Sequence, residues 1–251
     1  MKIIQLENVG KKFILSHQGD GLIGNIFPRL SSQMTIEEFW ALKNINIEIG
    51  EGRVIGIIGR NGAGKSTLLN IIAGICTPTE GKIEIKGRVS SLLSLGAGFQ
   101  DELSGKENIY LNASILGMKR EEVKRKFRQI VDFSELDGFL DVPIQTYSQG
   151  MRMRLGFSVG IHVDFDVLVI DEIISVGDVS FQKKCYEKII DFKRQGKTMV
   201  ITTQSLDIVE RICDEVFLLE NGKLEAQGEP EFVINRYLKL LNERGFSKIQ
   251  C

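Results

Sequence analysis

Gly59-Arg60-Asn61-Gly62-Ala63-Gly64-Lys65-Ser66-Thr67 is the stretch that decides the fold of this 251-residue chain. An apolar, β-branched run of strand length, Arg53–Ile58, comes before it, and Leu68–Gly74 after it is typical of a buried helix that ends at glycine. A glycine-rich loop between a strand and a helix turns backbone N–H groups and a helix N-terminus toward phosphate oxygens. The sequence therefore predicts that this chain binds a nucleoside triphosphate. The alternative, a glycine-rich turn with a chance lysine, does not explain the flanking strand and helix.

Two side chains of this loop have distinct predicted roles. Lys65 is expected to reach the β- and γ-phosphates, and the Ser66 hydroxyl is expected to bind Mg²⁺. The other positions predicted to contact the nucleotide are Gly59, Asn61, Gly62, Ala63, Gly64 and Thr67.

A second motif supplies the carboxylates that hydrolysis needs. Val167–Ile170 is a run of four apolar residues, and Asp171 and Glu172 follow it directly. A carboxylate at the end of a buried strand is the expected Mg²⁺ partner of a phosphate loop, which assigns Asp171 to the metal. Glu172 is placed to polarise a water for in-line attack on the γ-phosphate. Without the phosphate loop, the two acids would be read as a solvated helix N-cap.

A third motif predicts another anion site. Ser148-Gln149-Gly150-Met151 is a Ser-x-Gly turn that opens a helix, with Ser148 as its N-cap. Because the phosphate loop already binds one end of a nucleotide, this turn needs a nucleotide from elsewhere. A head-to-tail pair of chains, in which each turn binds the partner's ATP, is the simplest solution. By itself such a turn would be read as a plain helix cap.

The composition limits the classes of partner. Lys+Arg 32 against Asp+Glu 33 gives a formal net charge of -1, which argues against sequence-independent nucleic-acid binding. No apolar segment approaches the roughly 18 residues of a membrane span, and the N-terminus lacks a secretory h-region. The four cysteines show no C-x-x-C pair and no metal-ligand spacing.

The order of the predicted elements indicates an α/β fold. Strand-like and helical runs alternate over Val167–Ile170, Ser180–Arg194, Thr198–Thr203, Leu206–Cys213 and Glu215–Glu220. This alternation predicts a parallel sheet with helices on both faces. The helical block Glu107–Leu116 and Arg120–Phe133 is too long for one crossover and predicts a separate subdomain. Ser16–Glu38, rich in Gly, Ser and Pro, is predicted to be an inserted loop, and Glu229–Arg244 an amphipathic helix.

Together these motifs resemble the nucleotide-binding subunit of ABC transporters over nearly the whole chain. The resemblance implies ATP and Mg²⁺ as cofactors and a P-loop NTPase fold with a mixed sheet core, an antiparallel β edge and a helical subdomain. It implies one nucleotide-binding domain over 1–251, with a RecA-like core at 1–98 and 157–228, helices at about 105–156 and a C-terminal helix at 229–251.

The resemblance also carries roles for residues outside the three motifs. Phe13 falls where an aromatic ring stacks on adenine, although Trp40 could stack there instead and Phe13 could be a core aromatic. Gln100 matches the glutamine that approaches Mg²⁺ and water and moves with the membrane partner. Ser175-Val176-Gly177-Asp178 matches the loop that crosses the dimer interface.

Two positions depart from the family pattern. Gln149 stands where a second serine or glycine is common, a mild change on an exposed turn. Gln204 stands at the switch position, where the family usually has histidine. Glutamine can donate one amide hydrogen bond to the γ-phosphate but cannot carry a positive charge. We therefore expect Gln204 to act in catalysis with slower turnover, while binding and dimerisation survive.

The segment Leu92–Tyr110 narrows the resemblance to one subfamily. Its sequence looks like the L-G-x-G-F-x-x-E-L-S-G-x-E-N-I-Y stretch of polysaccharide, O-antigen and teichoic-acid exporters, in the form without a C-terminal carbohydrate-binding domain. That resemblance implies a membrane-spanning permease subunit, a lipid-linked glycan as cargo, and a place at the cytoplasmic face of the bacterial inner membrane. The fold itself does not specify this cargo.

Other functions remain as alternatives. A transporter ATPase for a different cargo is the main one. A DNA-repair ATPase would need long coiled-coil insertions, and a translation factor would carry two cassettes in one chain. A binding module that does not hydrolyse ATP is compatible with Gln204 but leaves Lys65, Asp171 and Glu172 unexplained.

Overall fold

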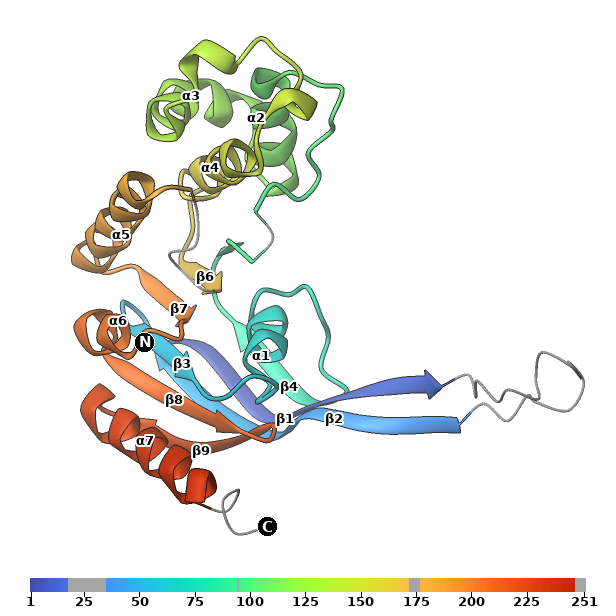
Figure 1. Ribbon diagram of the computed structural model, residues 1–251, viewed down its shortest axis with the longest axis vertical. Helices are drawn as coiled ribbons and strands as arrows, with labels where there is room; N and C mark the ends of the chain where they lie inside the picture. Colours follow the sequence, from blue (N-terminus) through green and yellow to red (C-terminus); the bar gives the residue numbers. More distant parts are fainter. Residues whose placement is uncertain (18–34, 94, 172–176, 247–251) are drawn as a thin grey trace, which may run out of the picture.

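The computed structural model describes residues 1–17, 35–93, 95–171 and 177–246 (Figure 1). Its centre is a six-stranded sheet in the order β5-β6-β7-β3-β8-β9. The strand bounds are β3 Val54–Ile58, β5 Val89–Ser91, β6 Val167–Asp171, β7 Thr198–Thr202, β8 Glu215–Glu220 and β9 Lys223–Gly228. Strands β5, β6, β7, β3 and β8 run parallel, and β9 pairs antiparallel with β8. The sheet is therefore mixed, as expected.

The strand β9 was not predicted from the sequence. It lies at the sheet edge, and its side chains alternate between exposed and half-buried positions instead of forming an apolar run. Asn221 and Gly222 turn the chain from β8 into β9, both with positive φ (49° and 76°). An Asn-Gly pair is the usual sequence signal of such a hairpin.

A second sheet has three antiparallel strands in the order β2-β1-β4, with β1 at Lys2–His17, β2 at Thr35–Gly50 and β4 at Glu80–Ile85. The expectation that Ser16–Glu38 forms a loop is wrong at both its ends, because β1 and β2 stay paired as far as His17 opposite Thr35. The backbone pairing places Phe13 opposite Phe39 and Lys12 opposite Trp40, and such cross-strand pairs stabilise the longer hairpin. Residues 18–34 lie outside the described part.

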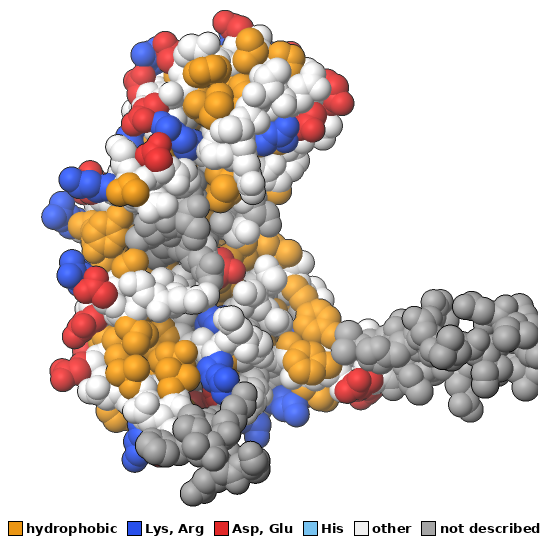
Figure 2. Space-filling view, viewed as in Figure 1, with side chains coloured by type: hydrophobic (Ala, Val, Ile, Leu, Met, Phe, Trp, Pro, Cys, Tyr) orange, Lys and Arg blue, Asp and Glu red, His pale blue; other side chains and the backbone are white. Residues whose placement is uncertain are grey.

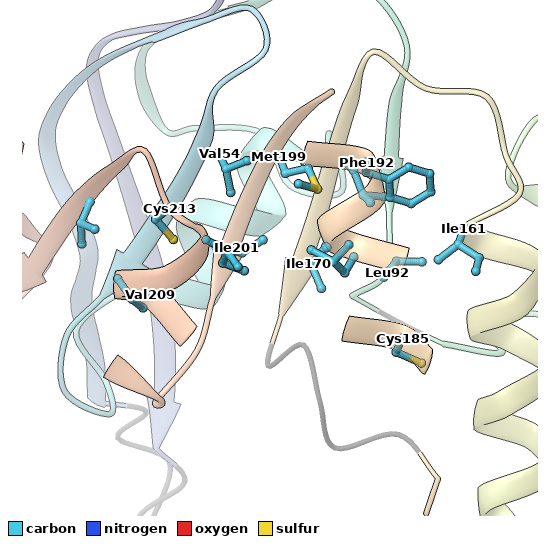
Figure 3. Packing of buried hydrophobic residues seen from close by; sticks show 14 of the residues in the cluster. Val54, Leu92, Ile161, Ile170, Cys185, Phe192, Met199, Ile201, Val209 and Cys213 are labelled. Carbon is cyan, nitrogen blue, oxygen red and sulfur yellow. The ribbon is translucent and has the colours of Figure 1, made fainter. Parts of the chain in front are cut away.

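Two hydrophobic layers cover the two faces of the six-stranded sheet. Alternate residues along each central strand point to opposite layers, since side chains alternate in a strand. One layer holds α5 (Val179–Arg194), α6 (Leu206–Ile212) and α7 (Pro230–Phe246), and Figure 3 shows its packing around Ile170 and Ile201. The other layer holds α1 (Lys65–Ile72) and the three-stranded sheet. Helices on both faces were expected.

The remaining helices form a lobe with its own hydrophobic cluster, at the top of Figure 1. They are α2 (Gly105–Ile115), α3 (Arg120–Ser134), the short 3-10 turns η1 (Asp137–Phe139) and η2 (Ile144–Thr146), and α4 (Gln149–Gly160). His162 follows Ile161, the C-cap of α4, and its Nδ1 lies 2.6 Å from the Ser158 carbonyl oxygen.

Candidate functional site

The phosphate loop lies between β3 and α1, as the sequence predicts. Helix α1 begins at Lys65, and Gly64 before it has a φ of 105°, a conformation that side chains disfavour. A Cβ on Gly64 would lie 2.6 Å from the carbonyl oxygen of Ala41 on β2. The loop is thus pressed against the three-stranded sheet, which fixes the position of the first turn of α1.

The ammonium group of Lys65 lies over the loop. Its Nζ donates to the carbonyl oxygens of Gly59 at 2.7 Å and Arg60 at 3.0 Å. Phosphate oxygens are charged and accept stronger hydrogen bonds than neutral carbonyls. The lysine is therefore placed to exchange one of these carbonyls for a phosphate oxygen when a nucleotide binds.

Ser66, Asp171 and Thr202 form an oxygen cluster at the carboxyl ends of β6 and β7. The Ser66 hydroxyl lies 3.3 Å from Oδ2 of Asp171, and the buried Thr202 hydroxyl donates to the other carboxylate oxygen. Asp171 and Thr202 face each other across the two strands. Proteins usually bind Mg²⁺ through oxygen atoms of one or two carboxylates, and waters and substrate phosphates complete its ligands. A hydroxyl and a carboxylate this close to the phosphate loop therefore fit the expected metal.

Gln204 lies on the other side of the phosphate loop. A pocket of about 350 Å³ is bounded by the start of the loop, by the segment after β7 and by α7; its residues include Gly59, Asn61, Gln204, Tyr237 and Leu241. The structure thus places the exposed Gln204 beside the loop. Glu172, the predicted catalytic carboxylate, lies outside the described residues, directly after Asp171.

The Ser148 turn occupies a separate hollow of about 460 Å³. Ser148 is the N-cap of α4, and its hydroxyl accepts a hydrogen bond from the Met151 N–H at 3.2 Å. The hollow is lined by Ser148, Gln149, Gly150, Met151, Met153, Arg154, Gly177 and Asp178. The other part of the predicted interface loop, Ser175 and Val176, lies outside the described residues.

Arg154 links α4 to the end of α3 and to the start of α5 at this hollow. Its guanidinium pairs with Glu135 at the end of α3 and lies 3.6 Å from Asp178, the N-cap of α5. The backbone N–H of Phe181, and then Arg154, hold the pKa of the Asp178 carboxyl below its usual range. Asp178 is therefore ionised at neutral pH and stays beside the Ser148 turn. Sequence reasoning assigned no role to Arg154.

Gln100 lies on the loop that leads into the helical lobe, and its backbone is clamped by Asn108. The Asn108 side chain is completely buried; its Oδ1 accepts from the Gln100 N–H at 2.8 Å, and its Nδ2 lies 3.0 Å from the Gln100 carbonyl. The Gln100 side chain itself is exposed. Neither Asn108 nor Thr202 was singled out from the sequence, although a polar residue inside an apolar strand or helix is a signal for such a role.

Phe13 lies on the β1–β2 hairpin, opposite Phe39, and is 41% exposed. Trp40, the alternative adenine partner, is half-buried and lies opposite Lys12. Phe13 is thus accessible for stacking on an adenine, and its role stays a prediction. In the space-filling view the edge above this hairpin is concave, between the strands and the helical lobe (Figure 2).

One chain brings only part of the predicted machinery together. The phosphate loop, Asp171 and Gln204 are grouped around the N-terminus of α1, while the Ser148 turn is in the helical lobe, at the N-terminus of α4 (Figure 1). The two hollows share no residue.

A family model described as ABC transporter matches residues 42–175, which run from β2 through the phosphate loop and the Ser148 turn to the segment after Asp171. This chain belongs to the ABC transporter family. It is an ATP-binding cassette, an ATPase coupled to transport.

Two relatives within the ABC transporter family are similar to this chain over most of its length. It is 44% identical over 238 residues to the O-antigen export system ATP-binding protein RfbB of Klebsiella pneumoniae, with 94% of this chain and 97% of the relative covered. It is 46% identical over 210 residues to the teichoic acids export ATP-binding protein TagH of Enterococcus faecalis, covering 84% of this chain and 47% of that relative.

Solved ABC cassettes share the fold. A dimeric ATP-binding cassette in a post-hydrolysis state with ADP and phosphate matches with a TM-score of 0.71 at 22% identity, covering 91% of this chain and 99% of the other. The ATP-binding subunit of an ABC transporter matches with a TM-score of 0.73 at 20% identity, covering 94% and 93%. No helix in the described ranges of this ABC protein is long and apolar enough to cross a membrane.

Proposed function

We propose that this chain is the ATPase subunit of an exporter that moves a lipid-linked glycan of the O-antigen, galactan, capsule or teichoic-acid type across the bacterial inner membrane. Two observations support the cargo: the names of the relatives, which are O-antigen and teichoic-acid export proteins, and the segment Leu92–Tyr110. In this proposal the chain works at the cytoplasmic face, bound to a membrane-spanning permease subunit.

The proposed mechanism follows from the separation of the two anion sites. The Lys65 loop and the Ser148 turn lie in different hollows of one chain, so one copy offers two halves of two different ATP sites. A head-to-tail dimer joins the Lys65 loop of each copy to the Ser148 turn of the other, and ATP lies between them. Dimeric solved cassettes of the same fold are consistent with this arrangement.

Each residue then has a defined task. Lys65 and the N–H groups of the loop hold the phosphates. Ser66 and Asp171 would hold Mg²⁺, which would supply positive charge against the phosphate oxygens. Glu172 orients the attacking water, Gln204 donates to the γ-phosphate, and Gln100 orients the water from the side of the helical lobe. Phe13 stacks on adenine.

The helices at about 105–156 form the moving part of this proposal. When the dimer closes, the Ser148 turn moves toward the nucleotide held by the other copy. Hydrolysis assisted by Glu172 then reopens the dimer. A transporter ATPase for another cargo shares all of these steps, so the cargo needs its own test.

The test uses a host from which this chain has been deleted. Cells are fractionated, and lipid-linked glycan inside is measured together with polymer at the surface. We expect glycan to accumulate inside and to disappear from the surface, with recovery by the wild-type chain and by Lys183→Ala at an exposed position of α5, but not by Lys65→Ala. Unchanged surface glycan without internal accumulation would remove the glycan assignment.

A further inference from the structure

The segment Leu95–Ser104, here called the Gln100 loop, is attached to the helical lobe at several points. The Asn112 side chain donates to the Ala97 carbonyl at 2.9 Å, and Asn108 donates to the carbonyls of Leu103 and Ser104 at 3.0 Å, in addition to clamping Gln100. Both side chains are buried, Asn108 at 0% exposure and Asn112 at 3%. Because the buried Nδ2 groups of both asparagines donate to backbone carbonyls of the loop, the loop follows α2 when α2 moves.

Asp101, the residue after Gln100, contacts both flanks of the Ser148 turn. Its carbonyl oxygen accepts from the Gln145 N–H at 3.1 Å, three residues before Ser148. Its carboxylate pairs with Nη1 of Arg152 at 2.6 Å, four residues after Ser148. One residue of the Gln100 loop therefore holds the chain on either side of the turn that binds the second nucleotide.

The ion pair also has an electrostatic reason. Arg152 is the fourth residue of α4, near a helix end where the backbone dipole favours negative charge. A lone cation there would be unfavourable, and the Asp101 carboxylate compensates it. Both side chains are partly exposed, at 55% for Asp101 and 33% for Arg152, so both can be substituted without opening the core.

We propose that Asp101 and Arg152 are positioning residues that keep the Ser148 turn in register with Gln100. Gln100 serves the nucleotide of its own chain, and the Ser148 turn serves the nucleotide of a second copy. The pair therefore couples the two ATP sites of the dimer, because a shift of the loop at one site moves the turn at the other. This inference rests on the proposed roles of Gln100 and Ser148.

The test measures ATP-dependent dimerisation of purified Glu172→Gln protein by light scattering, across a range of ATP concentrations. Asp101→Ala and Arg152→Ala are each expected to raise the ATP concentration for half-maximal dimerisation about five-fold or more, the lower end of typical couplings between sites. The exchanged pair, Asp101→Arg with Arg152→Asp, is expected to return to within about two-fold of the parent.

Controls separate coupling from stability. Glu121→Ala removes an exposed ion pair of the same lobe, with Lys124 at 2.8 Å, and should behave as the parent. Binding of a fluorescent ATP analogue to the monomer should be unchanged in all variants, because the Lys65 loop is intact, and thermal unfolding checks the fold.

The outcomes are distinct. Single variants that dimerise like the parent, or an exchanged pair that stays as weak as the singles, would overturn the inference and leave the proposed function standing. A parent that binds ATP but never dimerises would overturn the shared ATP site, and this coupling with it.

Discussion

Gly156 on α4 gives the sharpest prediction, because it lies directly against the start of the Gln100 loop. A Cβ on Gly156 would lie 2.5 Å from the backbone N of Gly96 and 3.1 Å from the carbonyl carbon of Leu95. Ordinary Cβ contacts begin near 3.4 Å, so Gly156→Ala must push this backbone away by about 0.9 Å. Gly160, one turn further along the same helix, is the matched control, since its Cβ would meet only the end of the Leu92 side chain.

The two variants should differ in both stability and activity. Gly156 is inside the helix, so its change to Ala gains about 1 kcal/mol of helix propensity, whereas Gly160 is the last residue of α4 and gains less. Overpacking against backbone costs about 3 kcal/mol, the upper end of the usual range, so Gly156→Ala loses about 2 kcal/mol net. For a chain of this size that lowers Tm by about 4–8 °C. A displacement near 1 Å in a catalytic constellation can cost about 100-fold, so we expect kcat for ATP to fall by about 10- to 100-fold.

The assays are thermal unfolding and steady-state ATP hydrolysis with the purified chain. Gly160→Ala should keep the wild-type Tm or exceed it slightly, and should hydrolyse ATP within about two-fold of wild type, because Leu92 can adjust. If Gly156→Ala keeps wild-type turnover while it shows the predicted loss of Tm, then the position of the Gln100 loop does not control hydrolysis and our reasoning is wrong.

Three further predictions concern single positions. Gln204→His should raise ATP turnover several-fold, since a histidine can carry the charge that glutamine lacks; an unchanged steady-state rate would refute the role of this position. Gly64→Ala should lower Tm by several degrees more than Gly62→Ala, because both have positive φ but only a Cβ on Gly64 meets the Ala41 carbonyl, at 2.6 Å; equal Tm values would contradict this. Burial lowers the pKa of His162. The unfolded chain therefore binds the proton more readily, and this contribution to stability is present above about pH 6.5 and is lost as the pH falls below it. The free energy of unfolding is measured in urea at pH 7.5 and at pH 5.5. Between these two pH values it should fall less for His162→Gln than for wild type. An identical fall would exclude His162 as the cause.

Much of the fold could be predicted because its signals are local. The run before Gly59 and the run before Asp171 are continuous apolar strands, which is how buried parallel strands look in a sequence. Capping residues such as Ser148 also act within one turn of the chain, so the start of α4 was predicted to the residue.

The errors of prediction concern strands whose partners are needed to define them. The outer halves of β1 and β2 and the edge strand β9 gain their order from cross-strand pairing, which a sequence does not display. The same holds for the site. Thr202, Asn108 and the Asp101–Arg152 pair act on residues that are distant along the chain, and their neighbours became known only from the structure.

The most direct measurement of the central claim, that each ATP site is shared by two copies, is to mix two inactive variants. Lys65→Ala removes the phosphate-loop lysine and Ser148→Arg blocks the turn, so each variant alone should be inactive. In a random mixture half of the dimers pair one of each, and these contain one intact site out of two, so the account predicts about a quarter of wild-type ATP turnover. A mixture no more active than the separate variants would contradict a shared site.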